Sequence, residues 1–164
     1  MTGMSTKTAE TRSLARNPHD RKKRLAAKQE LSRPAVKFTG VQARAVGHGF
    51  RDCFARSGLP VWACSILPEH VHLVVGRGSS DIEQVVNHLK GAATRALIDE
   101  KLHPFAELAV TGKRPPKCWA RGEWSVFLDS PEDIERCIAY VENNPVKDGK
   151  PQQTWPFVTA YRTE

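Results

Sequence analysis

The sequence predicts an α+β sandwich in which a largely antiparallel sheet carries helices on one side. Short apolar runs alternate with longer segments of helical periodicity, and the expected elements follow one another as strand, helix, hairpin, helix, hairpin and helix. The chain has 164 residues, of which 40% are hydrophobic, so it can bury one core of ordinary size. We therefore expect one folded domain over residues 34–164, preceded by an arm over residues 1–33.

Hydrophobic period and turn residues place the individual elements. The expected elements are, in chain order, a strand at 35–39, a helix at 41–54, a hairpin at 61–75, a helix at 81–97, a hairpin at 119–128, a helix at 131–143 and an irregular segment from 151. Gly58 ends the first helix, and Ser80 with Glu83 forms a capping box for the second. Ser130 caps the third helix, which should end before Pro145 because the residue preceding a proline disfavours helix.

The arm over residues 1–33 differs from the rest of the chain in charge. It holds nine Lys or Arg against three Asp or Glu, whereas the remaining chain holds sixteen against fifteen, so six of the seven net positive charges lie in the arm. Few of its residues are large and apolar, and we expect it to be disordered, with a short helix allowed at 25–31. A mobile basic arm can bind nucleic acid by releasing counterions from phosphates, although a solvated tail explains the same composition. The basic cluster consists of Arg21, Lys22, Lys23 and Arg24.

The second strand of the first hairpin carries His70 and His72. Alternate residues of a strand lie on the same face, about 6.5 to 7 Å apart, so the two imidazoles stand side by side. Neutral imidazole is a common ligand of divalent metal ions, and the pair can supply half of a metal site. The alternative is that both histidines are ordinary polar residues on the outer face of a sheet.

The last helix carries Tyr140 and Asn144, which are four residues apart, so both side chains can point the same way near the helix end. Tyr140 can equally be a packed helix tyrosine with a solvated hydroxyl, and Asn144 can simply end the helix before Pro145. In the helix at 81–97, Lys90 and Arg95 are among the outward polar positions. The tryptophans are more typical of a core than of a base-stacking surface. They are Trp62, Trp119, Trp124 and Trp155.

Composition disfavours several classes of protein. The four cysteines are scattered and form no Cys-x-x-Cys pair, so we expect neither a zinc knuckle nor a disulfide framework, and a reduced cytoplasm fits best. No apolar run approaches the roughly 20 residues of a membrane helix, which predicts a soluble protein. Nothing suggests a glycine loop that cradles phosphate.

Four motifs stand in a definite order along the chain: Leu-Pro-Glu-His-Val-His-Leu-Val-Val at 67–75, Leu-Lys at 89–90, Trp-Ala-Arg-Gly-Glu-Trp at 119–124 and Tyr-Val-Glu-Asn-Asn-Pro-Val at 140–146. A His-hydrophobic-His triplet is a weak signal by itself. Its position after Leu-Pro, and 70 residues before Tyr-x-x-x-Asn-Pro-Val, makes it specific. In this order the motifs resemble those of the HUH single-tyrosine transposases, and among them the REP-associated tyrosine transposases. The resemblance covers residues 60–149.

The resemblance implies a ferredoxin-like (RRM-like) fold and a transposase, or a domesticated relative, that cleaves and rejoins single-stranded DNA bearing hairpins. It implies that His70, His72 and Asn144 bind a divalent metal ion, Mg²⁺ or Mn²⁺. Tyr140 would be the nucleophile that forms a 5′-phosphotyrosine. A homodimer, in which the tyrosine of one chain serves the histidines of another, is one arrangement that the resemblance allows.

The resemblance also implies that the helix carrying Lys90 and Arg95 faces DNA. The chain departs from the family pattern in two places. Its arm is longer and more basic than the pattern requires, and the residues at 36–39 do not match the opening motif of the family. These departures bear on DNA specificity more than on the chemistry.

Two other functions fit the same residues. A sandwich with a basic arm can bind RNA or single-stranded DNA without cutting it. A metal-dependent nuclease can use the same two histidines with water as its nucleophile, in which case Tyr140 would be dispensable.

Overall fold

The computed structural model describes residues 35–162, which form a mixed α+β structure with a two-stranded antiparallel sheet and three α-helices. The elements are α2 (Gly40–Ser57), β1 (Val61–Ile66), β2 (Val71–Val75), α3 (Ile82–Asp99), the short 3₁₀ helix η2 (Ala106–Leu108) and α4 (Pro131–Lys147). The predicted α+β class is confirmed. The predictions of a disordered arm and of a short helix at 25–31, and the cluster Arg21, Lys22, Lys23 and Arg24, lie outside the described residues.

Helix α2 begins and ends where its sequence carries capping residues. The Thr39 hydroxyl accepts a hydrogen bond from the Gln42 amide, and the Gln42 side chain accepts one from the Thr39 amide, which together form a capping box. At the other end Gly58 has a φ of 66°, a left-handed conformation that glycine adopts without steric cost. The predicted stop at Gly58 is therefore confirmed.

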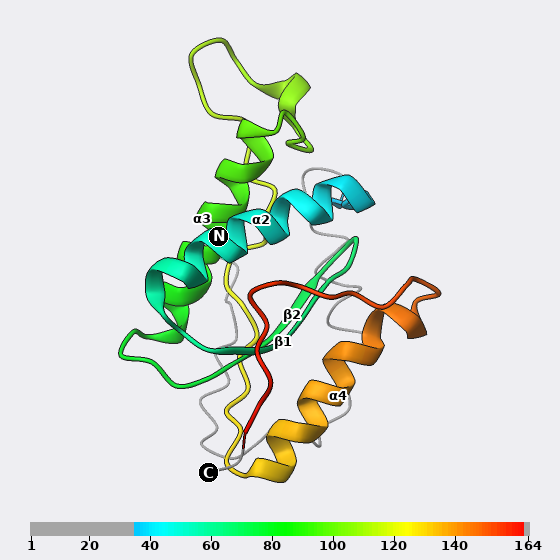
Figure 1. Ribbon diagram of the computed structural model, residues 1–164. Coiled ribbons are helices and arrows are strands. Elements are labelled where there is room, and N and C mark those ends of the chain that lie inside the picture. The colour runs from blue at the N-terminus through cyan, green and yellow to red at the C-terminus, as the bar shows by residue number, and fades with distance from the viewer. Residues whose placement is uncertain (1–34, 163–164) are drawn as a thin grey trace, which may run out of the picture.

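The β1–β2 hairpin has two faces that pack against different helices. Ser65 pairs with His72 and Ile66 with Val71, and a register shift between Val61 and Ala63 marks a bulge. One face packs with α2 and α3 through a core that includes Val61, Cys64, Ile66, Leu89, Ala93 and Leu97. The other face packs with α4 through Ala63, Val74 and Val141. Figure 1 shows α4 on the opposite side of the hairpin from α2 and α3. The prediction of helices on one side is wrong, because both faces of the hairpin carry apolar side chains that need burial.

Helices α2 and α3 cross in close contact at small residues. A Cβ atom added to Gly49 would lie 2.6 Å from the Ala92 carbonyl oxygen, and this distance is too short for any side chain. Ala92 and Ala93 are buried at the same crossing. The absence of larger side chains there allows the two backbones to approach. The two helices together contribute to the apolar core that packs on the hairpin.

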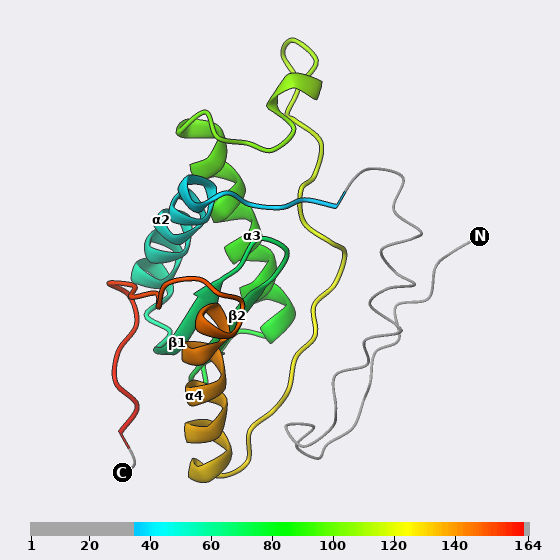
Figure 2. The same ribbon diagram turned by 90° about the vertical axis from the view of Figure 1, so that its right-hand side faces the viewer.

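Two segments that the sequence predicts as strands are irregular. Within 35–39, Phe38 donates one backbone hydrogen bond to Pro68 (2.8 Å), and its ring packs 5.3 Å from that of Trp119. The segment 119–128 forms no hairpin and is held by side chains instead, including the Trp119 indole N–H that donates to the Thr94 hydroxyl. Figure 2 shows this part of the chain in yellow, descending along one side of the molecule to the start of α4. Both segments have apolar residues that pack, but within residues 35–162 neither has a paired strand beside it.

Two helix boundaries also differ from the prediction. Asp81, and not Ser80, caps α3, and its carboxylate accepts from the Glu83 amide. Ser130 caps α4 as predicted, but that helix continues through Pro145 to Lys147. Pro145 is fully buried, so packing of this turn offsets the hydrogen bond that a proline cannot donate. No helix within residues 35–162 is long and apolar enough to cross a membrane.

The C-terminal segment covers the outer edge of β1. The Gln153 side chain both donates to the Ile66 carbonyl and accepts from the Ile66 amide, each at 2.8 Å, and the Thr159 amide donates to the Val61 carbonyl. Trp155 lies against Gly47, where any Cβ atom would overlap its ring. This segment, predicted to be irregular, thus supplies hydrogen-bond partners to backbone groups at the edge of β1 without forming a strand.

Candidate functional site between β2 and α4

The two histidines of the His-Val-His motif lie together at the start of β2. Their ring centroids are 4.8 Å apart and the ring planes are inclined by 78°. His72 lies within β2, and His70 immediately precedes it. Both side chains are half-buried. The alternation of the strand therefore brings both imidazoles to one place, with a solvent-accessible side.

Helix α4 brings Tyr140 to the same place. The centroid of its ring lies 5.7 Å from that of His72, in an edge-to-face arrangement, and 43% of the residue is exposed. Because α4 packs on both strands, the helix can hold a tyrosine beside the histidines of its own chain. Tyr140 is thus accessible to solvent while its ring contacts the hairpin.

Asn144 lies one helical turn after Tyr140 and is only 8% exposed. Its side-chain nitrogen is buried and has no hydrogen-bond partner among the described residues. The Ser65 hydroxyl, on the residue that pairs with His72, is also buried without a partner in the described part of the chain. A buried polar atom without a partner costs about 1–3 kcal/mol, so this face of the hairpin carries more polar character than packing alone requires.

The donor set fits a divalent metal ion in part. Imidazole nitrogens and amide oxygens both bind such ions, and bonds from histidine nitrogen to zinc are about 2.0–2.1 Å long, so rings this close can reach one ion. Within residues 35–162 no three His, Cys, Asp or Glu side chains come together to hold a metal ion. A third ligand from the described residues would therefore be of another type, and the amide of the buried Asn144, one helical turn after Tyr140, has suitable chemistry.

Lys90 and Arg95 do not form one surface. Five residues along a helix turn the side-chain direction by about 140°, so the two side chains point to different sides of α3. The Lys90 ammonium donates to the backbone carbonyls of Ala120 (3.0 Å) and Gly122 (2.5 Å), and burial lowers its pKa although the Glu123 carboxylate opposes the change. Lys90 thus holds the 119–122 segment against α3, whereas Arg95 is exposed.

Sequence reasoning missed two residues at this site. The Lys147 ammonium lies 5.1 Å from the centroid of the Tyr140 ring. Their spacing of seven residues would have indicated a shared helix face, but the helix was expected to end before Pro145. Ser65 carried no signal, because its position opposite His72 depends on the register of the hairpin.

The predicted core role of the tryptophans holds for three of the four. Trp119 and Trp155 pack against the core of α2 and α3, and Trp62 packs against the core under α4, with the Tyr161 ring 4.7 Å away. Trp124 is exposed, as is the nearby Phe127. The segment before α4 therefore presents aromatic surface to solvent.

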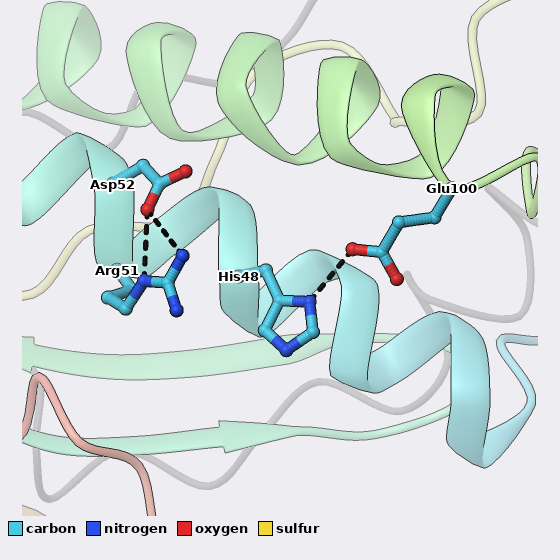
Figure 3. A network of polar contacts seen from close by, with 4 residues as sticks. All are labelled: His48, Arg51, Asp52 and Glu100. Carbon is cyan, nitrogen blue, oxygen red and sulfur yellow. Dashed lines mark hydrogen bonds and ion pairs between the residues drawn. The ribbon is translucent and has the colours of Figure 1, made fainter.

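A separate group of charged side chains lies on α2 and at the end of α3, where Figure 3 shows the His48 ring facing Glu100 (2.8 Å) and Arg51 beside Asp52 (2.9 Å). These pairs are largely exposed, and exposed ion pairs add little to stability. Because these side chains are so exposed, we do not consider them a site.

The four cysteines are free thiols: Cys53, Cys64, Cys118 and Cys137. Burial raises the pKa of all four, most strongly for Cys64 inside β1. They are therefore neutral at physiological pH and poor nucleophiles.

Comparisons of the chain with protein-family models, with curated proteins and with solved structures give no match.

Proposed function

We propose that this protein cleaves and rejoins single-stranded DNA, with Tyr140 as the nucleophile and with His70, His72 and Asn144 holding a divalent metal ion. The observation that carries the proposal is the contact between the Tyr140 ring and His72, 5.7 Å apart within one chain. An accessible phenol beside two convergent imidazoles is a suitable arrangement for a covalent step at an anionic phosphodiester.

The step can be written from the residues of this chain. The Tyr140 phenolic oxygen attacks the phosphorus and its proton passes to water. The bond between phosphorus and the 3′ oxygen breaks, and the departing oxygen takes a proton from water. The products are a 5′-phosphotyrosine and a strand that ends in a 3′-hydroxyl. Because the phosphotyrosine conserves the energy of the broken bond, a 3′-hydroxyl can later displace Tyr140 and rejoin the DNA without a nucleotide cofactor. A bound divalent ion supplies charge neutralisation and orientation of the phosphate.

The role of Asn144 is supported by its burial. Rotation of the terminal amide group exchanges the positions of its nitrogen and oxygen, so the oxygen can be turned toward the histidines. Its unpartnered nitrogen indicates that the present orientation is not locked by a hydrogen bond. Asn144 is therefore free to act as the third ligand beside His70 and His72.

The ferredoxin-like arrangement is part of this proposal, and so is a DNA-facing role for the exposed Arg95, whereas the Lys90 ammonium is occupied by the carbonyls of Ala120 and Gly122. In a ferredoxin-like sheet, the segments at 35–39 and 119–128 would supply the strands beside the hairpin. Lys90 already fastens the second of these segments through two carbonyls. The basic cluster at 21–24 would add affinity for DNA of any sequence.

A non-catalytic module that binds single-stranded nucleic acid is the second candidate. Trp124 is 56% exposed and Phe127 is 67% exposed, and both follow the exposed Arg121 in an irregular segment. Exposed aromatic rings beside basic residues are typical of surfaces on which bases stack. This function needs neither Tyr140 nor a metal ion.

The deciding experiment incubates the full chain and Mn²⁺ with a hairpin-bearing single-stranded DNA labelled at either end. We expect a band that survives denaturation and retains a 3′ label but not a 5′ label, because the tyrosine would keep the downstream strand. Tyr140→Phe should remove both the band and the cleavage, while Tyr161→Phe serves as the matched control because Tyr161 packs on Trp62. Cleavage by Tyr140→Phe at the parental rate would assign the reaction to water. DNA binding without any cleavage would favour the binding module.

A further inference from the structure

Lys147, in the last turn of α4, lies next to the proposed nucleophile. Its ammonium nitrogen is 5.1 Å from the centroid of the Tyr140 ring. Residues seven apart on a helix are rotated by about 700°, which is 20° short of two turns, so both side chains leave the same face. Tyr140 is therefore flanked by His72 from the hairpin and by Lys147 from its own helix.

This neighbourhood exists because α4 does not stop at Pro145. The Asp148 amide donates to the carbonyls of Asn144 and Pro145, and the Lys150 amide also donates to the Pro145 carbonyl. These bonds close the final turn and keep residue 147 in helical conformation. A helix that ended one turn earlier would leave Lys147 in a loop, away from the face that carries Tyr140.

Lys147 also differs in charge from the rest of α4. The helix contains the carboxylates of Glu132, Asp133, Glu135 and Glu142, and the basic side chains of Arg136 and Lys147. Arg136 pairs with Asp133 in the first half of the helix. A DNA strand that approaches Tyr140 thus meets a helix with more acidic than basic side chains. In the half of α4 that carries Tyr140, the basic residue is Lys147.

We propose that Lys147 binds a non-bridging oxygen of the phosphate that Tyr140 attacks; this inference rests on the proposed function and deepens it. A lysine ammonium has three rotatable donors and forms charge-assisted hydrogen bonds with phosphate. An exposed cation–π contact is weak, so the ammonium can leave the ring face for a phosphate oxygen. Its charge also stabilises the negative charge that accumulates on the phosphoryl group during attack.

The first test measures binding without chemistry, in the full chain carrying Tyr140→Phe. The probe is a labelled single-stranded hairpin DNA in which one phosphate at a time is a neutral methylphosphonate. Lys147→Gln should weaken binding and reduce the slope of log K against log salt by about 0.7, the value for one single-strand phosphate. One methylphosphonate should weaken binding by the lysine protein and have no further effect on Lys147→Gln. Lys150→Gln is the matched control, because Lys150 lies three residues on and bonds to the Asp148 carbonyl.

The second test uses the chain with Tyr140 intact. Lys147→Gln should slow formation of the covalent adduct about 10- to 100-fold, Lys147→Arg should restore part of the rate, and thermal unfolding should show that both variants are folded. A phosphate is coupled to Lys147 if its replacement by methylphosphonate weakens binding by the lysine protein but not by Lys147→Gln. If no phosphate is coupled and Lys147→Gln forms the adduct at the parental rate, the inference is wrong while Tyr140 stays the nucleophile. A coupled phosphate other than the one that becomes linked to Tyr140 would also overturn it. If the parent forms no adduct at all, the proposed cleavage fails instead, and coupling at one phosphate would then reveal Lys147 as a binding contact only.

Discussion

The two faces of the β1–β2 hairpin are filled with different chemistry. The face toward α2 and α3 is an apolar core in which Ala93 and Leu97 have no exposed surface. The face toward α4 has a smaller apolar core, and it buries polar atoms of Ser65 and Asn144 that have no partner among residues 35–162. A face selected only for stability would replace such atoms with apolar ones. We infer that α2 and α3 supply most of the stability, and that the α4 face retains polar groups for function.

The largest effect should come from breaking the apolar face. Leu97→Ala removes a fully buried side chain and leaves a cavity, which costs about 2–5 kcal/mol of unfolding free energy. Denaturant unfolding would measure this, and Ile98→Ala, at a half-exposed neighbouring position, should change stability much less. Equal losses for the two variants would contradict the assignment of stability to this core.

Replacing the histidines should affect metal binding and leave stability nearly unchanged. His70→Ala or His72→Ala removes a proposed ligand, and we expect affinity for Mn²⁺ to fall at least tenfold, which corresponds to about 1.4 kcal/mol. Titration calorimetry on the full chain would measure the affinity, with His88→Ala as an exposed control. Unchanged Mn²⁺ binding by the double variant His70→Ala and His72→Ala would place the ligands elsewhere.

Removing the unpartnered polar atoms should separate function from stability within the α4 face. Asn144→Leu deletes a buried amide whose nitrogen makes no hydrogen bond, so the unfolding free energy should stay the same or rise by about 1 kcal/mol. Mn²⁺ affinity should fall in the same variant. Ser65→Ala should behave likewise in stability, with a smaller effect on the metal. A loss of stability comparable to that of Leu97→Ala would show that Asn144 serves the packing.

The smallest effect concerns His103, a buried histidine at the edge of the α2–α3 core. Burial lowers its pKa, so the folded chain binds the proton less tightly than the unfolded chain does. The stability that depends on neutral His103 is fully present above the unfolded pKa of about 6.5 and decreases as the pH falls toward the lowered folded pKa. Melting temperatures between pH 7 and pH 5 should fall less steeply for His103→Asn than for the parent. Parallel curves would show that His103 does not contribute to the acid sensitivity.

The local features of the chain follow from its sequence. The left-handed Gly58 that ends α2, the Ser130 cap of α4 and the hairpin around Pro68 depend on residues within a few positions of one another. The proximity of His70 and His72 has the same origin, because alternation along a strand needs no information from the rest of the fold. Caps, turns and periodicity are therefore sufficient for these elements.

The tertiary structure decides what depends on distant partners. The segments at 35–39 and 119–128 have strand-like composition, but a strand exists only where another pairs with it. Side chains hold the two segments instead: the Lys90 ammonium bonds to Ala120 and Gly122, and the Phe38 ring packs on Trp119. Burial of Pro145 overrides the local rule that should have ended α4, because packing contributes more than the missing hydrogen bond costs. The placement of α4 on the second face, and with it the contacts of Tyr140 with His72 and Lys147, results from burying apolar surface across the chain, which no short window of sequence contains.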